Sequence, residues 1–242
     1  MRWNRLWTYL KGIRLSVIAI LTVAGLSATF AQIPELQEKV AEVKEAAAAN
    51  KQAIAQYTWV EQVTVSLKGE QKKQEHFQVR IGPDGKPQKQ SLDPPEQAAA
   101  PSGGRAKQHI VEKKKDEYKE YVDQIKALIQ QYVPPEKDMI AQTVQKGNVA
   151  LGPAGSAPGQ FKLVLTNYVK QGDNMTLAFD QRQKALVGVT IASYLSDPKD
   201  AVNVSVTFAR ISGGPSHVAS QTIDGVSKQL TIVISNSNYQ HL

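Results

Sequence analysis

The second half of the chain, from Gln160 onward, consists of short runs in which apolar and polar residues alternate. The clearest run carries Val202, Val204, Val206 and Phe208 at every second position. Such alternation is typical of a β-strand with one buried and one solvated face. The runs are separated by short turn sequences such as DPKD at 197–200, and connections this short join antiparallel neighbours. This half of the chain is therefore predicted to be an antiparallel meander.

Two earlier segments add a hairpin and a helix. Residues 57–81 alternate in the same way around a turn at Lys68-Gly69-Glu70, which predicts a hairpin, and a third short strand is expected near 88–92. Before them, residues 34–57 carry apolar side chains at spacings of three and four, with Asn50 as a polar member of the stripe. This period predicts an amphipathic helix, which either packs on the sheet or forms a coiled-coil arm.

The middle of the chain is predicted to be loop and helix. Residues 93–105, DPPEQAAAPSGGR, have no periodicity and predict a mobile loop. An apolar face at helical spacing covers 106–133, and 136–146 are expected to form a short helix, whereas the Gly- and Pro-containing stretch 147–159 is predicted to be loop. The expected fold class is α+β: an antiparallel sheet of about eight strands, in the form of an incomplete barrel, covered by two amphipathic helices.

The first 31 residues have the features of a secretory signal peptide. Basic residues precede a largely apolar run over 15–26, and Thr29 and Ala31 supply the small residues of a cleavage site. The run is shorter than the roughly 20 residues that span a bilayer, so cleavage is predicted rather than anchoring. We expect a periplasmic or secreted protein, with a signal peptide over 1–31. A single α+β domain is expected over 32–242, with its loop at 93–105 and a helical insertion at 106–146.

Composition narrows the possible partners. The chain has no cysteine, so an exported form must be stabilised by its core without disulfides. Its 29 basic and 22 acidic residues include four basic ones within the first 31 residues, so most of the positive surplus belongs to the expected signal peptide. The small remainder does not indicate a nucleic-acid partner. Membrane contact is expected only through the signal peptide before cleavage.

A search for catalytic, metal and nucleotide motifs finds none, so no catalytic residue, metal ligand or cofactor is predicted. The sequence lacks the spacings of a serine nucleophile elbow, a zinc site and a phosphate-binding loop. His76, His109, His217 and His241 are not spaced as metal ligands and are expected at the surface. Glu61 falls on the apolar side of its strand. Because an unpaired buried carboxylate is very costly, it is expected at the sheet edge or paired with a lysine.

The order of these elements resembles a known family. A signal peptide, an amphipathic helix, strands that open with an aromatic residue, a helical insertion and a long antiparallel meander resemble the periplasmic lipoprotein carriers and sensors of the LolA, LolB and RseB type. The resemblance covers most of the chain after residue 31 and implies an incomplete barrel closed by helices, with an apolar cavity for acyl chains. The chain is also similar to exported proteins of soil bacteria such as the acidobacteria, which implies no function.

Three functions are compatible with these observations. The first is a non-enzymatic periplasmic binding protein for a lipid, a lipoprotein or another hydrophobic ligand. The second is a protein-interaction module of the cell envelope without a small-molecule ligand, and the third is a hydrolase whose site is assembled only in three dimensions. For the first, the expected ligand-binding residues are the apolar positions of the strands; the same residues would otherwise form a filled core. They are Trp59, Val63, Phe77, Phe161, Leu163, Val204 and Phe208.

The cleavage site is directly testable. Protein recovered from an exporting host is expected to begin at Gln32, because Thr29 and Ala31 occupy the small-residue positions before it. N-terminal sequencing checks this. Recovery of a chain that starts at Met1 in the membrane fraction would contradict it.

Overall fold

The computed structural model describes residues 49–94, 105–133, 136–155 and 158–242. The expected signal peptide, most of the first helix and most of the 93–105 loop lie outside the described residues and stay predictions. Within the described residues, no helix is long and apolar enough to cross a membrane.

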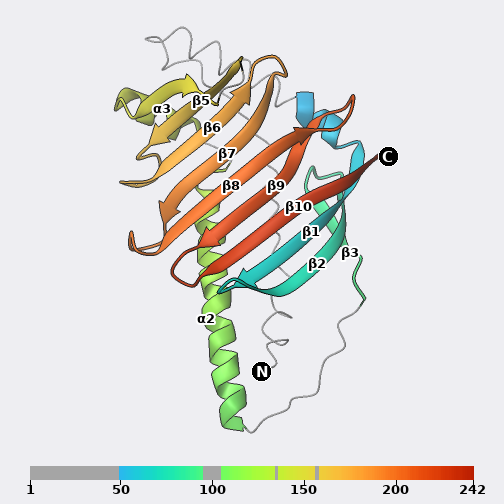
Figure 1. The fold of residues 1–242 in the computed structure, drawn as a ribbon, viewed down its shortest axis with the longest axis vertical. Coiled ribbons are helices and arrows are strands. Elements are labelled where there is room, and N and C mark those ends of the chain that lie inside the picture. The colour runs from blue at the N-terminus through green and yellow to red at the C-terminus, as the bar shows by residue number, and fades with distance from the viewer. Residues whose placement is uncertain (1–48, 95–104, 134–135, 156–157) are drawn as a thin grey trace.

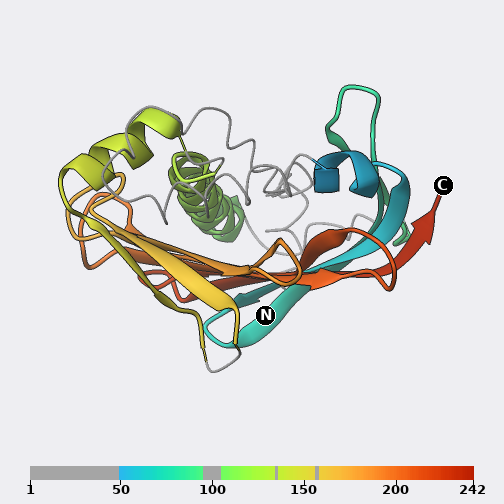
Figure 2. The same cartoon turned by 90° about the horizontal axis from the view of Figure 1, so that it is seen from above.

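One antiparallel sheet dominates the structure (Figure 1). Its ten strands lie in the order β3-β2-β1-β10-β9-β8-β7-β6-β5-β4. The two strand groups of the chain are joined where β1 pairs with β10. Figure 2 shows that the sheet is curved, with one concave face, and it stays open because β3 and β4 are its two edges. The strands are β1 Tyr57–Leu67, β2 Glu70–Ile81, β3 Pro87–Ser91, β4 Val149–Pro153, β5 Gln160–Thr166, β6 Asn174–Asp180, β7 Ala185–Tyr194, β8 Ala201–Arg210, β9 Ser216–Gly225 and β10 Leu230–His241.

The antiparallel sheet was predicted correctly, but about eight strands was an underestimate. The short strand expected near 88–92 is present as β3. The loop predicted over 147–159 was wrong, because β4 lies within it and pairs with β5 from Val149↔Leu165 to Pro153↔Phe161. Its sequence VALGP contains the glycine and proline that indicate a loop. An edge strand accepts a proline because one side of its backbone needs no partner strand.

Helix α2, Arg105–Gln130, lies on the concave face of the sheet (Figure 2). Its buried side chains, including Tyr121 and Ile125, form the core together with Tyr132, which lies just beyond the helix, and with inward residues of β1 and β5 to β10. The shorter α3, Lys137–Gln145, contributes Ile140 to the same core. One amphipathic helix therefore covers the sheet, as predicted. Of the second predicted cover, only the helical residues 49–54 are described.

Hydrogen bonds fix both helical segments to the sheet. The Tyr132 hydroxyl, just beyond α2, donates to the Asp173 carboxylate at 2.5 Å, and that carboxylate also accepts three backbone N–H groups at 168–170. Burial and the neighbouring Asp173 carboxylate raise the pKa of Tyr132, which keeps it a neutral donor. At the other end, the Asn50 amide donates to the Ser216 carbonyl and accepts from the Ser216 N–H. The polar member of the helical stripe thus caps the start of β9.

Gly225 allows α2 to approach β9 closely. A Cβ atom at this position would lie 2.6 Å from the Tyr121 ring and hydroxyl and 3.0 Å from Ile125. These contacts are too short for any side chain. A glycine is therefore required here by packing between the helix and the sheet.

Gly225→Ala is expected to lower the free energy of unfolding by about 1–3 kcal/mol, because α2 must move away from the sheet. Gly188→Ala is the matched control, since it also lies in a strand but its Cβ would meet only ordinary contacts at 3.6 Å or more. Urea denaturation of both variants measures the difference. An equal loss of stability in both variants would show that the close approach of α2 to β9 does not set the cost of a side chain at Gly225.

Candidate functional site

The sheet divides where β9 and β10 stop pairing. Their ladder runs from Leu230↔Gly225 to Ser235↔Ser220 and ends there. Beyond that point β10 continues along β1 as far as His241, and β9 continues along β8 as far as Ser216. The two strands therefore fork, and side chains replace backbone pairing between them. Asn236 donates its amide to the Val218 carbonyl at 2.9 Å across the fork.

The side chains on the concave face change at the fork from aliphatic to polar and aromatic. Along β1 it carries Leu67, Val65 and Val63, and then Glu61 and Trp59; along β10 it carries Ile232 and Ile234, and then Asn236. Side chains of successive inward positions follow the two-residue period of a strand. We call the group at this end of the concave face the fork cluster. It consists of Trp59, Glu61, Phe77, Lys89, Gln221, Asn236 and Tyr239, together with His217, whose ring contacts Tyr239.

A buried ion pair lies at the centre of the fork cluster. Glu61 is 5% exposed and forms an ion pair with Lys89 of β3. Lys89 also lies 5.8 Å from the centroid of the Phe77 ring. The expected lysine partner of Glu61 is thus confirmed, although Glu61 itself lies on β1, two strands in from the edge. Because the two charges neutralise each other, the pair leaves no net charge in the cluster.

Aromatic rings fill the space beside the ion pair. Tyr239 stacks on Trp59 with ring centroids 5.5 Å apart, and the His217 ring lies 4.1 Å from Tyr239. Burial raises the pKa of Tyr239, with a contribution from the Glu61 charge. Burial lowers the pKa of His217, opposed by its hydrogen bond to the Val218 carbonyl. His217 was expected at the surface; it is partly exposed there, with its ring against Tyr239 in the fork.

Three buried polar atoms of the fork cluster have no hydrogen-bond partner in the described part of the chain. They are Trp59 Nε1, Gln221 Nε2 and Asn236 Oδ1. Gln221 is only 2% exposed. The large majority of buried polar groups in native structures have a hydrogen-bond partner. Three buried atoms without one in a single cluster therefore mark a place where a further hydrogen-bonding group would be stabilised. Sequence reasoning missed Gln221 and Asn236, although both continue the inward phase of strands that are otherwise apolar.

The seven residues expected to line a ligand site fall into three groups. Leu163 and Val204 belong to the core that packs on α2, with Val63 and Phe208 partly buried against it. Phe161 lies apart, with its ring 5.3 Å from Phe179. Trp59 and Phe77 belong to the fork cluster. Four of the seven thus lie in or against the α2 core, and only Trp59 and Phe77 lie in the fork cluster, at the end of the concave face beyond that core.

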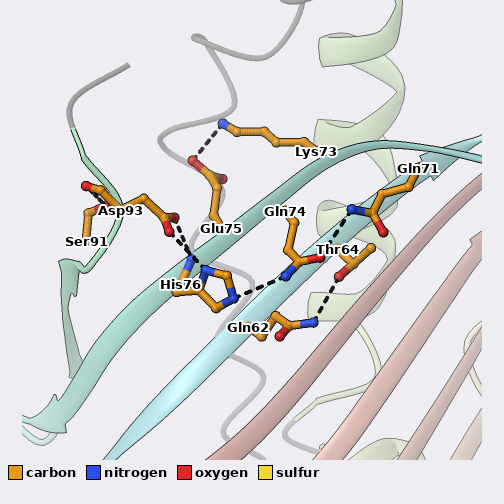
Figure 3. A network of polar contacts seen from close by, with 9 residues as sticks. All are labelled: Gln62, Thr64, Gln71, Lys73, Gln74, Glu75, His76, Ser91 and Asp93. Atoms are coloured by element: carbon orange, nitrogen blue, oxygen red, sulfur yellow. Dashed lines mark hydrogen bonds and ion pairs between the residues drawn. The ribbon is translucent and has the colours of Figure 1, made fainter. Parts of the chain in front are cut away.

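A second polar network lies on β2 (Figure 3). The Asp93 carboxylate accepts from the His76 backbone N–H at 2.7 Å and lies 2.9 Å from His76 Nδ1. Burial opposes ionisation of Asp93, but the hydrogen bonds from His76 and the charge of Lys73 lower its pKa overall. His76 Nε2 is 3.2 Å from the Gln74 amide. The contacts between His76 and Asp93 tie the segment after β3 to β2.

The other two histidines are His109 and His241. His241 is exposed at the end of β10, and the His109 side chain is outside the described set. Among the described residues, no three acidic or histidine side chains are grouped as a metal site requires.

Comparisons with known proteins find remote structural likeness. No protein-family model matches the chain, and no curated protein sequence matches it. It is similar to a DUF1329 family protein from Desulfovibrio piger, with a TM-score of 0.40 and 12% identity over 83% of this chain and 92% of that one. It is similar to a LolA superfamily protein from Nitrosomonas europaea, with a TM-score of 0.35 and 9% identity over 84% and 92%.

A third likeness is to a putative outer membrane lipoprotein-sorting protein domain from Vibrio parahaemolyticus, with a TM-score of 0.40 and 7% identity over 83% of this chain and 91% of that one. The resemblance to LolA-type proteins that was expected from the order of elements is thus also found among these solved structures. At TM-scores of 0.35 to 0.40 the shapes are only loosely alike. The function is therefore inferred from this chain's own residues.

His217 should make the stability of the protein depend on pH. Its pKa is lowered in the folded state, so the unfolded chain binds a proton first as the pH falls through about 6.5. The free energy of unfolding is expected to decrease from pH 7 to pH 5, by at most about 1.4 kcal/mol per pH unit from this residue. His217→Gln should remove this component, whereas His241→Gln should leave it. Urea titrations at each pH measure it, and an unchanged slope in His217→Gln would contradict the assignment.

Proposed function

We propose that the protein is a non-enzymatic, exported binding protein that holds a lipid, a lipoprotein or another hydrophobic ligand at the fork cluster. The observation that carries the proposal is the division of the concave face. Helix α2 packs on the aliphatic end of that face and fills it with side chains. Large aromatic side chains, Trp59, Phe77 and Tyr239, gather instead at the other end, together with buried polar atoms that have no hydrogen-bond partner among the described residues.

This combination fits a binding site better than a structural core. Ligand sites are lined mostly by apolar and aromatic side chains with a few polar groups that orient the ligand. A structural core of the same size would bury aliphatic residues and satisfy its polar atoms. The α2 core meets this description, because Tyr132, Tyr121 and Asp173 all have hydrogen-bond partners.

The export expected from residues 1–31 fits the same function, because the space between two membranes is aqueous and an apolar ligand needs a protein to cross it. An exported binding protein must keep an apolar ligand out of water between membranes, and a curved sheet with one apolar face provides a surface for it. Localisation to the periplasm or the cell surface rests on the signal peptide expected over residues 1–31.

A solvatochromic fatty-acid probe tests the proposal. The probe is expected to bind the folded protein saturably at about one site per chain, with fluorescence titration as the measurement. Val63→Trp should weaken binding roughly tenfold or more, because Val63 lies on the concave face between the core and Glu61 and a larger ring there intrudes on the site. Thr64→Trp, on the opposite face, is the matched control.

Two outcomes would contradict the proposal. Absence of saturable probe binding in the parent protein would favour an interaction module. Equal weakening by Val63→Trp and Thr64→Trp would show that the concave face is not the site. Leu163→Trp should overpack the α2 core and lower stability by about 1–3 kcal/mol without blocking the probe in the molecules that stay folded.

A further inference from the structure

The turns of the sheet lie at two opposite ends, because the strands are antiparallel. The β1–β2, β5–β6, β7–β8 and β9–β10 turns lie at one end, and the β2–β3, β4–β5, β6–β7 and β8–β9 turns lie at the other. The helical residues 49–54 belong to the second end, since Asn50 bonds the backbone of Ser216 at the start of β9. This second end lies at the upper right of Figure 1.

The second end of the sheet is basic. Its described turns, the two strand residues on each side of them and residues 49–58 include only two acidic residues, Asp84 and Asp180. Asp180 is 1% exposed, and its carboxylate accepts hydrogen bonds from Gln160 and from two backbone N–H groups. The same residues include six that are Lys or Arg, which we call the basic rim. They are Lys51, Arg80, Lys86, Arg182, Lys184 and Arg210.

The side chains of the basic rim are available to a partner. All six residues are exposed. Arg182 Nη2 lies 4.0 Å from the Asp180 carboxylate, and the other five form no ion pair with a described residue. Positive charge is therefore not neutralised at this end of the sheet.

The opposite end of the sheet has a balanced charge. The four turns there, counted in the same way, include four lysines and five acidic residues. They are Lys68, Lys170, Lys199 and Lys228, and Glu70, Asp173, Asp197, Asp200 and Asp224. Composition alone predicted membrane contact only through the signal peptide, because the small net charge of the whole chain hides this uneven distribution.

The basic rim is too long for one small anion. It extends from the β2–β3 turn to the β6–β7 turn, which are six strand spacings apart in the sheet order. At about 4.8 Å per strand this is roughly 30 Å, whereas a single phosphate group is far smaller. Cations spread over this length fit an extended surface that repeats negative charge, such as the head groups of anionic phospholipids.

Two further features favour a lipid surface over another polyanion. The fork cluster lies at this end, since Trp59 is the third residue of β1 and Tyr239 is the third from the end of β10. Leu242, which follows β10, is 67% exposed and is the most exposed large hydrophobic residue in the described part of the chain. Cations beside exposed apolar groups are the combination that holds proteins at the interface of an anionic bilayer.

We propose that the basic rim docks the protein on the surface of a membrane that contains anionic phospholipids, with this end of the sheet toward the head groups. The inference goes beyond the proposed ligand site, because the rim is a separate surface with its own partner. Docking in this orientation brings the fork cluster close to the bilayer, where a hydrophobic ligand is taken up or released.

Co-sedimentation with vesicles tests the inference. The sample is the form recovered from an exporting host, and the vesicles contain either phosphatidylcholine alone or equal parts of phosphatidylcholine and phosphatidylglycerol. Binding is expected to the mixed vesicles and not to phosphatidylcholine alone. It should weaken strongly between about 0.1 M and 1 M salt, because the screening length falls from about 10 Å to about 3 Å.

Two double variants with the same loss of charge locate the contact. Lys86→Gln with Lys184→Gln removes two rim cations, and Lys199→Gln with Lys228→Gln removes two exposed cations from the opposite end. The rim variant should bind the mixed vesicles roughly tenfold or more weakly, because each cation near an anionic surface contributes about fivefold in affinity. The matched control should stay within about twofold of the parent protein.

Four outcomes would overturn the inference. They are absence of binding to the mixed vesicles, equal binding to both kinds of vesicle, equal weakening by the two double variants, and rim-dependent binding of double-stranded DNA without vesicle binding. The fatty-acid probe is titrated separately in solution, where the rim variant should bind it as the parent does. A failure of probe binding therefore contradicts the proposed function alone, and a failure of vesicle binding contradicts only the rim.

Discussion

The pairing of β1 with β10 is the interaction on which the whole structure depends. β1 to β3 form one strand group and β4 to β10 another, and the single ladder between Tyr57↔His241 and Leu67↔Leu230 makes them one sheet. Without it, the concave face would be split into a three-stranded and a seven-stranded sheet, each with one further exposed edge. The ladder also places Trp59 beside Tyr239 and Glu61 beside Asn236, residues from opposite ends of the described chain.

The fork follows from the same ladder. A bulge between Thr58 and Val60 adds a residue to β10 opposite β1, and Asn238 there has a positive φ of 54°. A bulge bends and twists its strand, which favours separation of β10 from β9 at this end of the sheet. The result is one face with two environments. The aliphatic end is covered by α2 and filled by buried side chains. The other end combines aromatic rings with buried polar atoms that have no hydrogen-bond partner in the described part of the chain.

Much of the fold could be read from local patterns, and the site could not. Alternation correctly indicated the buried face of strands such as β8, where Val202, Val204 and Val206 are buried and the residues between them are exposed. The Lys68-Gly69 turn was equally clear, and both residues have positive φ, as a tight hairpin requires. The lysine partner of Glu61 followed from the cost of burying a charge. Periodicity within a strand does not indicate which distant strands are neighbours. It therefore could not predict that Asn236 pairs with Glu61, or that β10 separates from β9.

The position of β10 also has a consequence for how the protein acquires its structure. The last strand of the described chain lies in the interior of the sheet, between β1 and β9, rather than at an edge. The β1–β3 hairpins and the β4–β9 meander can each form as soon as they are synthesised, but neither can join the other until β10 is available. Assembly of the sheet therefore waits for β10 and is dominated by long-range pairing, which slows folding. During that interval β1 and β9 each expose an unpaired edge, the state in which the chain is most exposed to aggregation and most in need of a chaperone.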